Sequence, residues 1–100
     1  MKLLVLKVLT QFDGKTPLKI QLEGKATDLS LREYFLTVLG SNQSEDGKES
    51  IQVSKLGMDI YKAETELEIK PEDVILLKKI VGKAKNFTDL VKGQVLTILG

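Results

Sequence analysis

The sequence predicts a single α+β domain over residues 1–100, in which an N-terminal β-hairpin packs with about four helices. Segments near the N-terminus have the apolar or alternating pattern of strands, and the segments after residue 30 have helical spacing with recognisable start signals. The composition, 42% apolar and 29% charged, is that of a folded chain. One hundred residues suffice for one hydrophobic core but not for two.

Two segments are expected to form the hairpin. Residues 3–9 are apolar and β-branched, as in a buried strand, and residues 18–22 alternate between apolar and polar side chains, as in a strand with one wet face. The Asp13-Gly14 pair predicts the turn between them, because glycine adopts the positive φ that a tight turn requires. Gly24 is expected to end the second strand.

The first helix has the clearest start signal. Ser30 and Glu33 have capping-box spacing, in which the serine hydroxyl accepts from the amide of the third residue of the helix and the glutamate reaches back. Gly40 is expected to end this helix as a left-handed cap. After a polar loop, the second helix is predicted to begin between Ser44 and Lys48. Its predicted inner face consists of Val53, Leu56, Gly57, Ile60 and Tyr61.

A short strand and two further helices complete the prediction. Leu67 and Ile69 alternate with two glutamates, which predicts a strand near residues 66–69 that can join the hairpin as a third member. Pro71, followed by two acidic residues, indicates the start of a third helix. The last helix is expected to follow a break and to be capped by Asn86. The predicted inner faces of these two helices comprise Val74, Leu77, Ile80 and Val81, and then Phe87, Leu90, Val91, Val95 and Ile98.

The residue types that the chain lacks exclude most active-site chemistry. It has no histidine and no cysteine, so it offers no thiolate nucleophile, no imidazole base, no disulfide and no thiolate metal site. We find no set of nucleophile, base and oxyanion donor, no glycine-rich phosphate loop and no acidic spacing typical of Ca²⁺ or Mg²⁺ sites, so we expect neither an enzyme nor a cofactor. The net charge is only +1, which predicts no general attraction to nucleic acid or to anionic membranes.

The sequence also predicts a cytoplasmic protein. Its first residues are apolar, but Lys7 interrupts the run and no small-residue cleavage site follows, so a strand is favoured over a signal peptide. No segment approaches the roughly 20 apolar residues that span a bilayer. The five aromatic residues are expected mostly at core positions, which leaves no stacking platform for single-stranded nucleic acid.

Several apolar residues fall off the main faces of their predicted helices. Ile51 and Met58 lie seven residues apart and therefore share one side of the second helix, opposite Val53 and Ile60. Leu36, Ile75 and Leu96 are off the main faces of the first, third and last helices in the same way. Such residues can line an oligomer or partner interface, and the alternative is a helix packed on two sides or single exposed apolar residues of an ordinary surface.

The C-terminal third is net basic and provides a second hypothesis. Five of its lysines are candidates for phosphate contacts, namely Lys78, Lys79, Lys83, Lys85 and Lys92. A solvated helix face explains the same lysines, because Lys78 points away from Lys79 and Lys83 on a helical wheel. The last two helices could form a helix-turn-helix, but Lys92 is the only basic residue of the helix that would enter the groove.

Six short segments, spread over nearly the whole chain, carry a resemblance to a known group of proteins: Asp13-Gly14-Lys15, Leu29-Ser30-Leu31-Arg32, Glu45-Asp46-Gly47-Lys48, Leu56-Gly57-Met58-Asp59-Ile60-Tyr61-Lys62-Ala63, Lys70-Pro71-Glu72-Asp73 and Val91-Lys92-Gly93-Gln94-Val95. In this layout the chain resembles small proteins of tailed phages and prophages that carry no assigned activity. The resemblance implies a viral origin and an assembly, accessory or host-interaction role in the bacterial cytoplasm or in association with the virion.

Taken together, the sequence predicts a non-enzymatic protein that acts by binding protein, either a second copy of itself or a viral or host partner. Leu36, Ile51, Met58 and Leu96 are the predicted contact residues. The alternative is a nucleic-acid-binding accessory protein that uses the basic C-terminal third.

Overall fold

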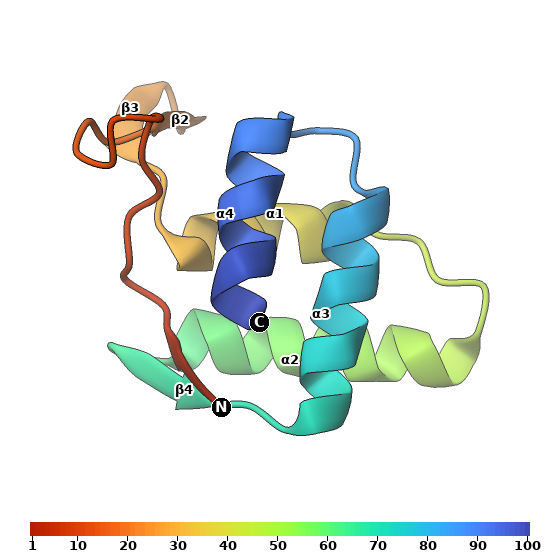
Figure 1. Cartoon of the computed structure of the whole chain (residues 1–100). Helices are drawn as coiled ribbons and strands as arrows, with labels where there is room; N and C mark the ends of the chain where they lie inside the picture. The colour runs from red at the N-terminus through yellow and green to blue at the C-terminus, as the bar shows by residue number, and fades with distance from the viewer.

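The computed structural model describes all residues from 1 to 100 and confirms an α+β fold with an N-terminal hairpin (Figure 1). It contains two small antiparallel sheets and four helices. The elements are β1 (Lys2–Leu4), β2 (Lys19–Leu22), β3 (Lys25–Asp28), α1 (Leu31–Ser41), α2 (Gly47–Lys62), β4 (Glu66–Glu68), α3 (Pro71–Lys83) and α4 (Asp89–Leu99). No helix combines the length and the apolar composition that a bilayer crossing requires.

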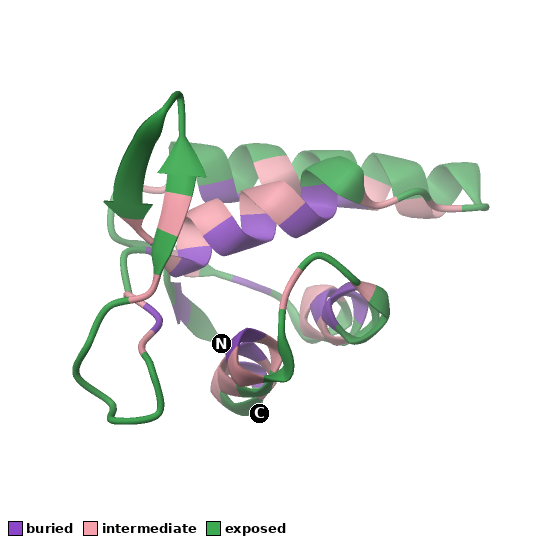
Figure 2. Cartoon of the chain, turned by 90° about the horizontal axis from the view of Figure 1, so that it is seen from above, coloured by how far each residue is buried: buried purple, intermediate pink, exposed green.

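The helices form two layers around one core. Helices α1 and α2 lie side by side, and α3 and α4 cross them steeply, so that α3 and α4 appear almost end-on in Figure 2. All 20 buried side chains are apolar or aromatic and belong to a single cluster. Tyr34 and Phe35 of α1 are its largest members, and their rings meet edge to face with centroids 5.5 Å apart. Each helix therefore buries one side in this core, and the remaining residues of α1 as far as Leu39 are half-buried.

The hairpin lies later in the chain than the turn signal predicted. It consists of β2 and β3, in the register Lys19↔Asp28, and its turn is Glu23-Gly24, with φ values of +51° and +79°. The Asp13-Gly14 segment forms a loop instead, closed by a single bridge between Thr10 and Pro17. There the hydroxyl of Thr16 and the amides of Thr16 and Lys15 donate to the Asp13 carboxylate and hold its pKa below its usual value. Gly14 has the predicted positive φ, +73°, but its turn closes this loop and does not join the two strands of the hairpin.

The strand predicted near residues 66–69 exists as β4, but it does not join the hairpin. It pairs with β1 in a separate antiparallel sheet, with Leu3 opposite Leu67. Charge favours this pairing, because the ammonium group of Met1 lies 3.1 Å from a carboxylate oxygen of Glu68 and Lys2 lies 3.7 Å from Glu66. Residues 3–9 therefore do not form one continuous strand of the hairpin. The first of them pair with β4, and Leu9 forms backbone hydrogen bonds with Leu18 and Leu29.

Most helix starts lie where their sequence signals predicted. The Ser30 side chain accepts from the amide of Glu33, Asp46 caps α2 within the predicted window, and α3 begins at Pro71. The second half of the predicted capping box differs, because the Glu33 carboxylate accepts from the Ser30 hydroxyl and not from the Ser30 amide. Two boundaries differ. Helix α1 continues through Gly40 to Ser41, and the cap of α4 is Thr88 where Asn86 was expected.

Two of the five aromatic residues lie outside the core, and one of them, Tyr61, corrects the predicted inner face of α2. Tyr61 is 71% exposed on the last turn of α2, because Ile60 takes the core position beside it. Phe12 is 90% exposed in the loop that precedes β2. The predicted inner face of α2 is correct for Val53, Leu56 and Ile60 only, since these three are buried and Gly57 is half-buried.

Candidate partner-binding surface

Helix α2 is stabilised by a cap and favourable charges at its ends and by the burial of one of its sides. The Asp46 carboxylate accepts from the amide of Lys48 at 2.9 Å, and Glu49 and Lys62 place charges of favourable sign in the first and last turns. Val53, Leu56 and Ile60 fill the core, at the spacing of one helix face. The opposite side of this 16-residue helix is exposed at Ile51, Met58 and Tyr61.

That opposite side carries a line of mostly apolar residues, which we call the outer strip: Ile51, Ser54, Met58 and Tyr61. Ile51 is 72% exposed and Met58 is 58% exposed, and Ser54 and Tyr61 are exposed as well. The spacing of three and four residues keeps the strip on one face over about 15 Å of helix. The structure thus places the predicted pair together in solvent and extends it with Tyr61, which the sequence analysis had assigned to the inner face.

One edge of the outer strip is basic. Lys48, Lys55 and Lys62, which we call the lysine row, follow one another at intervals of seven residues and therefore lie on one line beside the strip. All three are exposed, and none takes part in any of the four ion pairs of the chain. Asp59 lies next to the row, on the side away from the strip.

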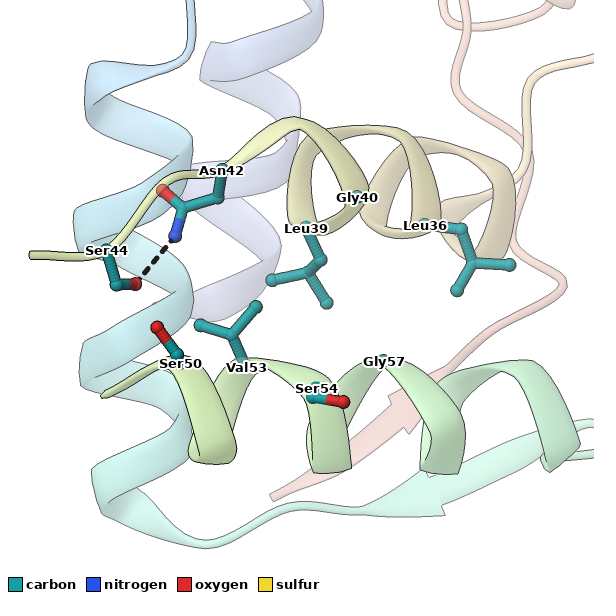
Figure 3. Close-up of a pocket in the computed structure, with 9 residues that line it drawn as sticks. All are labelled: Leu36, Leu39, Gly40, Asn42, Ser44, Ser50, Val53, Ser54 and Gly57. Atoms are coloured by element: carbon teal, nitrogen blue, oxygen red, sulfur yellow. Dashed lines mark hydrogen bonds between the residues drawn. The ribbon is translucent and has the colours of Figure 1, made fainter. Parts of the chain in front are cut away.

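The other edge of the outer strip is lined by small residues and meets α1. Between the two helices lies a cleft of about 330 Å³, in which Leu39 of α1 points toward Val53 of α2 (Figure 3). A methyl group added at Gly57 would lie 3.9 Å from Leu39, an ordinary contact, so the helices are close but not crowded there. The cleft is lined by Leu36, Leu39, Gly40, Asn42, Ser44, Ser50, Val53, Ser54 and Gly57.

The other two predicted contact residues are less accessible. Leu36 is half-buried against the core and lines the cleft beside α2, so it borders the surface that Ile51 and Met58 form. Leu96 is also half-buried against the core, but it lies on α4 in the other helix layer. The structure therefore brings three of the four predicted residues to one region and leaves Leu96 outside it.

The five candidate phosphate-binding lysines are mostly occupied within the chain. Lys79 forms an ion pair with Glu49 at 2.9 Å, which lowers the pKa of the Glu49 carboxyl and raises the pKa of Lys79. The Lys78 ammonium donates to the carbonyl of Gly100 at 2.7 Å. Lys92 donates to the carbonyls of Gly82 and Ala84, at the end of α3. Lys83 and Lys85 line a polar cleft beside the end of α1.

The structure reveals one groove that the sequence analysis missed. It has a volume of about 580 Å³ and lies between residues 7–14 and α4, with Phe12 at its rim. Gln94 holds its two sides together, because the amide of Thr10 donates to Oε1 at 3.0 Å and Nε2 donates to the carbonyl of Thr10 at 2.6 Å. The only signal in the sequence was an amide side chain near the apolar side of the last helix.

Two buried polar atoms have no hydrogen-bond partner in the chain, and neither forms a reactive group. The Tyr34 hydroxyl is enclosed in the core, and this burial raises its pKa to about 12. The Nε atom of Arg32 is the second, although the same guanidinium donates to the carbonyls of Ala63 and Glu64 and so ties α1 to the end of α2. No cluster of three or more acidic side chains is arranged to hold a metal ion.

Comparisons with known protein families, with curated proteins and with solved structures find no match to this chain. The function of the outer strip and the lysine row is therefore inferred from the exposure, spacing and charge of their residues.

Proposed function

We propose that this chain is a non-enzymatic protein that acts by binding another protein through the outer strip of α2. One observation carries the proposal: Ile51 and Met58 share one exposed side of a helix whose opposite side is buried in the core. Single exposed apolar residues are common on protein surfaces, whereas an aligned set is typical of a contact surface. The resemblance to phage proteins supports placing this contact in a viral assembly, accessory or host-interaction role.

The expected contribution of the two residues follows from their exposure. Full burial of an isoleucine or methionine side chain contributes about 1.5–3 kcal/mol. Because Ile51 is 72% exposed and Met58 is 58% exposed, covering both contributes about 2–4 kcal/mol, or about 30-fold or more in affinity. Methionine suits such a surface because its flexible thioether adapts to different partners.

Site-specific photo-crosslinking tests the proposal. A crosslinking amino acid is placed at position 51 or 58 of the full chain in bacterial cells, and the matched control is position 75, because Ile75 is 69% exposed on α3 in the other layer. We expect a defined protein adduct from positions 51 and 58 and none from position 75. In the complex so identified, Ile51→Ala with Met58→Ala should reduce affinity at least tenfold, and Ile75→Ala should not. Equal binding by both variants would refute the proposal.

The nucleic-acid alternative has less support. Three of its five lysines, Lys78, Lys79 and Lys92, already bond to groups of the same chain and would have to exchange these partners for phosphates. An electrophoretic shift with duplex and single-stranded DNA at low salt tests this alternative directly, because phosphate contacts are strongest there. Binding that is lost in the variant Lys83→Gln with Lys85→Gln would revive it.

A further inference from the structure

We propose that the partner segment of the outer strip is an acidic amphipathic helix of another protein and not a second copy of this chain. This inference rests on the proposed function and adds the chemistry of the partner to it. It comes from the position of the lysine row along one edge of the strip and of small uncharged residues along the other.

The outer strip has the geometry of one half of a helix pair. Ile51 and Met58 are one heptad apart, and Ser54 and Tyr61 occupy the second seam position of the same two heptads. A strip of this width is the narrow seam of a two-helix contact, in which partner axes lie about 8–10 Å apart. Ser54 lies between the two large apolar residues and leaves room there for a large side chain of the partner helix.

The lysine row lies where charges select the partner of such a pair. Lys48, Lys55 and Lys62 each occupy the position that flanks the seam, and flanking positions carry the ion pairs that set partner choice in paired helices. Because none of the three is paired within the chain, all are available to carboxylates of a partner. The complementary segment has apolar residues at its seam and Asp or Glu at intervals of seven residues along the facing edge.

A second copy of the chain that docks through its own outer strip does not supply these carboxylates. In an antiparallel two-fold pair the lysine rows would face each other, which is unfavourable for like charges. In a parallel pair each row would face Ser50 and Gly57 of the other copy, which carry no charge. Asp59 lies beyond the row, away from the seam, and does not reach across it in either arrangement.

Nucleic acid and membrane are less suitable occupants of the same surface. Phosphates would have to contact a strip whose centre is apolar, next to Asp59 and close to the acidic start of α2 at Asp46 and Glu49. An interfacial membrane helix requires a broad apolar face with bulky side chains, whereas this strip is one seam wide and interrupted by Ser54.

Fluorescence anisotropy with two labelled peptides tests the inference on the full chain. Each peptide is a helix of about three heptads with leucine at the seam positions, and its flanking positions are all glutamate in the first peptide and all lysine in the second. Like charges keep both peptides from pairing with themselves. We expect the glutamate peptide to bind at low salt, with an affinity that falls as salt is added, and the lysine peptide to bind at least about tenfold more weakly.

A charge exchange in the protein completes the test. The variant Lys48→Glu, Lys55→Glu and Lys62→Glu should reverse the preference between the two peptides. The matched control, Lys15→Glu, Lys25→Glu and Lys85→Glu, changes the net charge by the same amount at exposed lysines elsewhere and should preserve the preference. Ile51→Ala with Met58→Ala should weaken binding of both peptides to every variant.

Three results would overturn the inference, and each differs from failure of the proposed function. The first is equal binding of the two peptides to the unmodified chain, which requires no variant to fold. The second is a crosslink from position 58 to a second copy of the chain, with self-association unaffected by the charge exchange. The third is binding to anionic vesicles or DNA that needs the lysine row while the glutamate peptide does not bind. The proposed function itself fails if Ile51→Ala with Met58→Ala and the control Ile75→Ala bind the crosslinked partner equally well.

Discussion

Replacing Tyr34 with phenylalanine is expected to stabilise the fold, in contrast to the usual effect of this substitution. A buried tyrosine hydroxyl normally has a hydrogen-bond partner, and its loss costs about 1 kcal/mol. The Tyr34 hydroxyl has no partner in the chain, and the residue is fully buried, with its ring against those of Phe35 and Phe87. An unsatisfied buried polar group costs about 1–3 kcal/mol, so Tyr34→Phe should raise the free energy of unfolding by about 1 kcal/mol.

Urea denaturation followed by far-ultraviolet circular dichroism measures this change without relying on tyrosine fluorescence. The midpoint should rise with no change in the slope, and in a domain of this size the melting temperature should rise by about 4–8 °C for each kcal/mol. The exposed Tyr61 provides the matched control, because Tyr61→Phe should change stability by less than about 0.5 kcal/mol. A loss of stability in Tyr34→Phe would refute the reasoning, since it would show that the hydroxyl is hydrogen-bonded.

The same burial predicts how stability responds to alkali. The pKa of Tyr34 is about 12 in the folded chain, against about 10 for an unperturbed tyrosine. As the pH rises, the unfolded chain therefore loses this proton before the folded chain does. The contribution of Tyr34 to the free energy of unfolding is constant below about pH 10, and the free energy of unfolding falls as the pH rises toward 12. In the Tyr61→Phe background Tyr34 is the only tyrosine, and its phenolate absorbance should appear with a midpoint near 12. A midpoint near 10 in the folded variant would contradict its burial.

Three further substitutions test other contacts. Glu23→Asn should stabilise the hairpin by about 0.5–1 kcal/mol, because the residue has a φ of +51° that asparagine adopts more readily, and thermal unfolding measures this. Gln94→Ala should lower the free energy of unfolding by about 2 kcal/mol, because two hydrogen bonds to Thr10 are lost. Hydrogen exchange of the Thr10 amide should become faster, and an unchanged exchange rate would contradict the role of Gln94 in holding this loop. Lys79→Met should destabilise the chain at neutral pH, where it breaks the ion pair with Glu49. Because the pKa of Glu49 is lowered in the folded state, this difference should shrink as the pH falls below about 4.5 and vanish under acid conditions.

The features predicted correctly from the sequence are those that depend on neighbours within a few residues. The Ser30 cap of α1, the start of α2 and the start of α3 at Pro71 depend on residues within one helical turn, so no distant contact decides them. Strand pairing depends on segments far apart in the chain. Leu3 pairs with Leu67, which no local signal distinguishes from a pairing with the nearer segment around Ile20.

The part of the candidate site that lies on a single helix could be predicted from the sequence. Ile51 and Met58 share a side of α2 by periodicity alone, and the structure leaves that side exposed. Tyr61 was assigned to the interior because a helical wheel shows which residues share an arc but not how far a neighbouring helix covers that arc. The Phe12 groove could not be predicted, because it depends on the Gln94 amide reaching a loop that is 84 residues away in the sequence.

The lysine row has a second consequence for a chain that exposes an apolar strip. Because the lysine rows of two copies face each other in an antiparallel pair, the row opposes this form of self-association while it attracts an acidic partner. Neutralising Lys48, Lys55 and Lys62 to glutamine should therefore have two opposite effects: weaker binding of the glutamate peptide and a new, concentration-dependent dimer. Sedimentation equilibrium measures the dimer, which should disappear when Met58→Ala is added. A glutamine variant that stays monomeric at high concentration would show that the row selects a partner without preventing self-association.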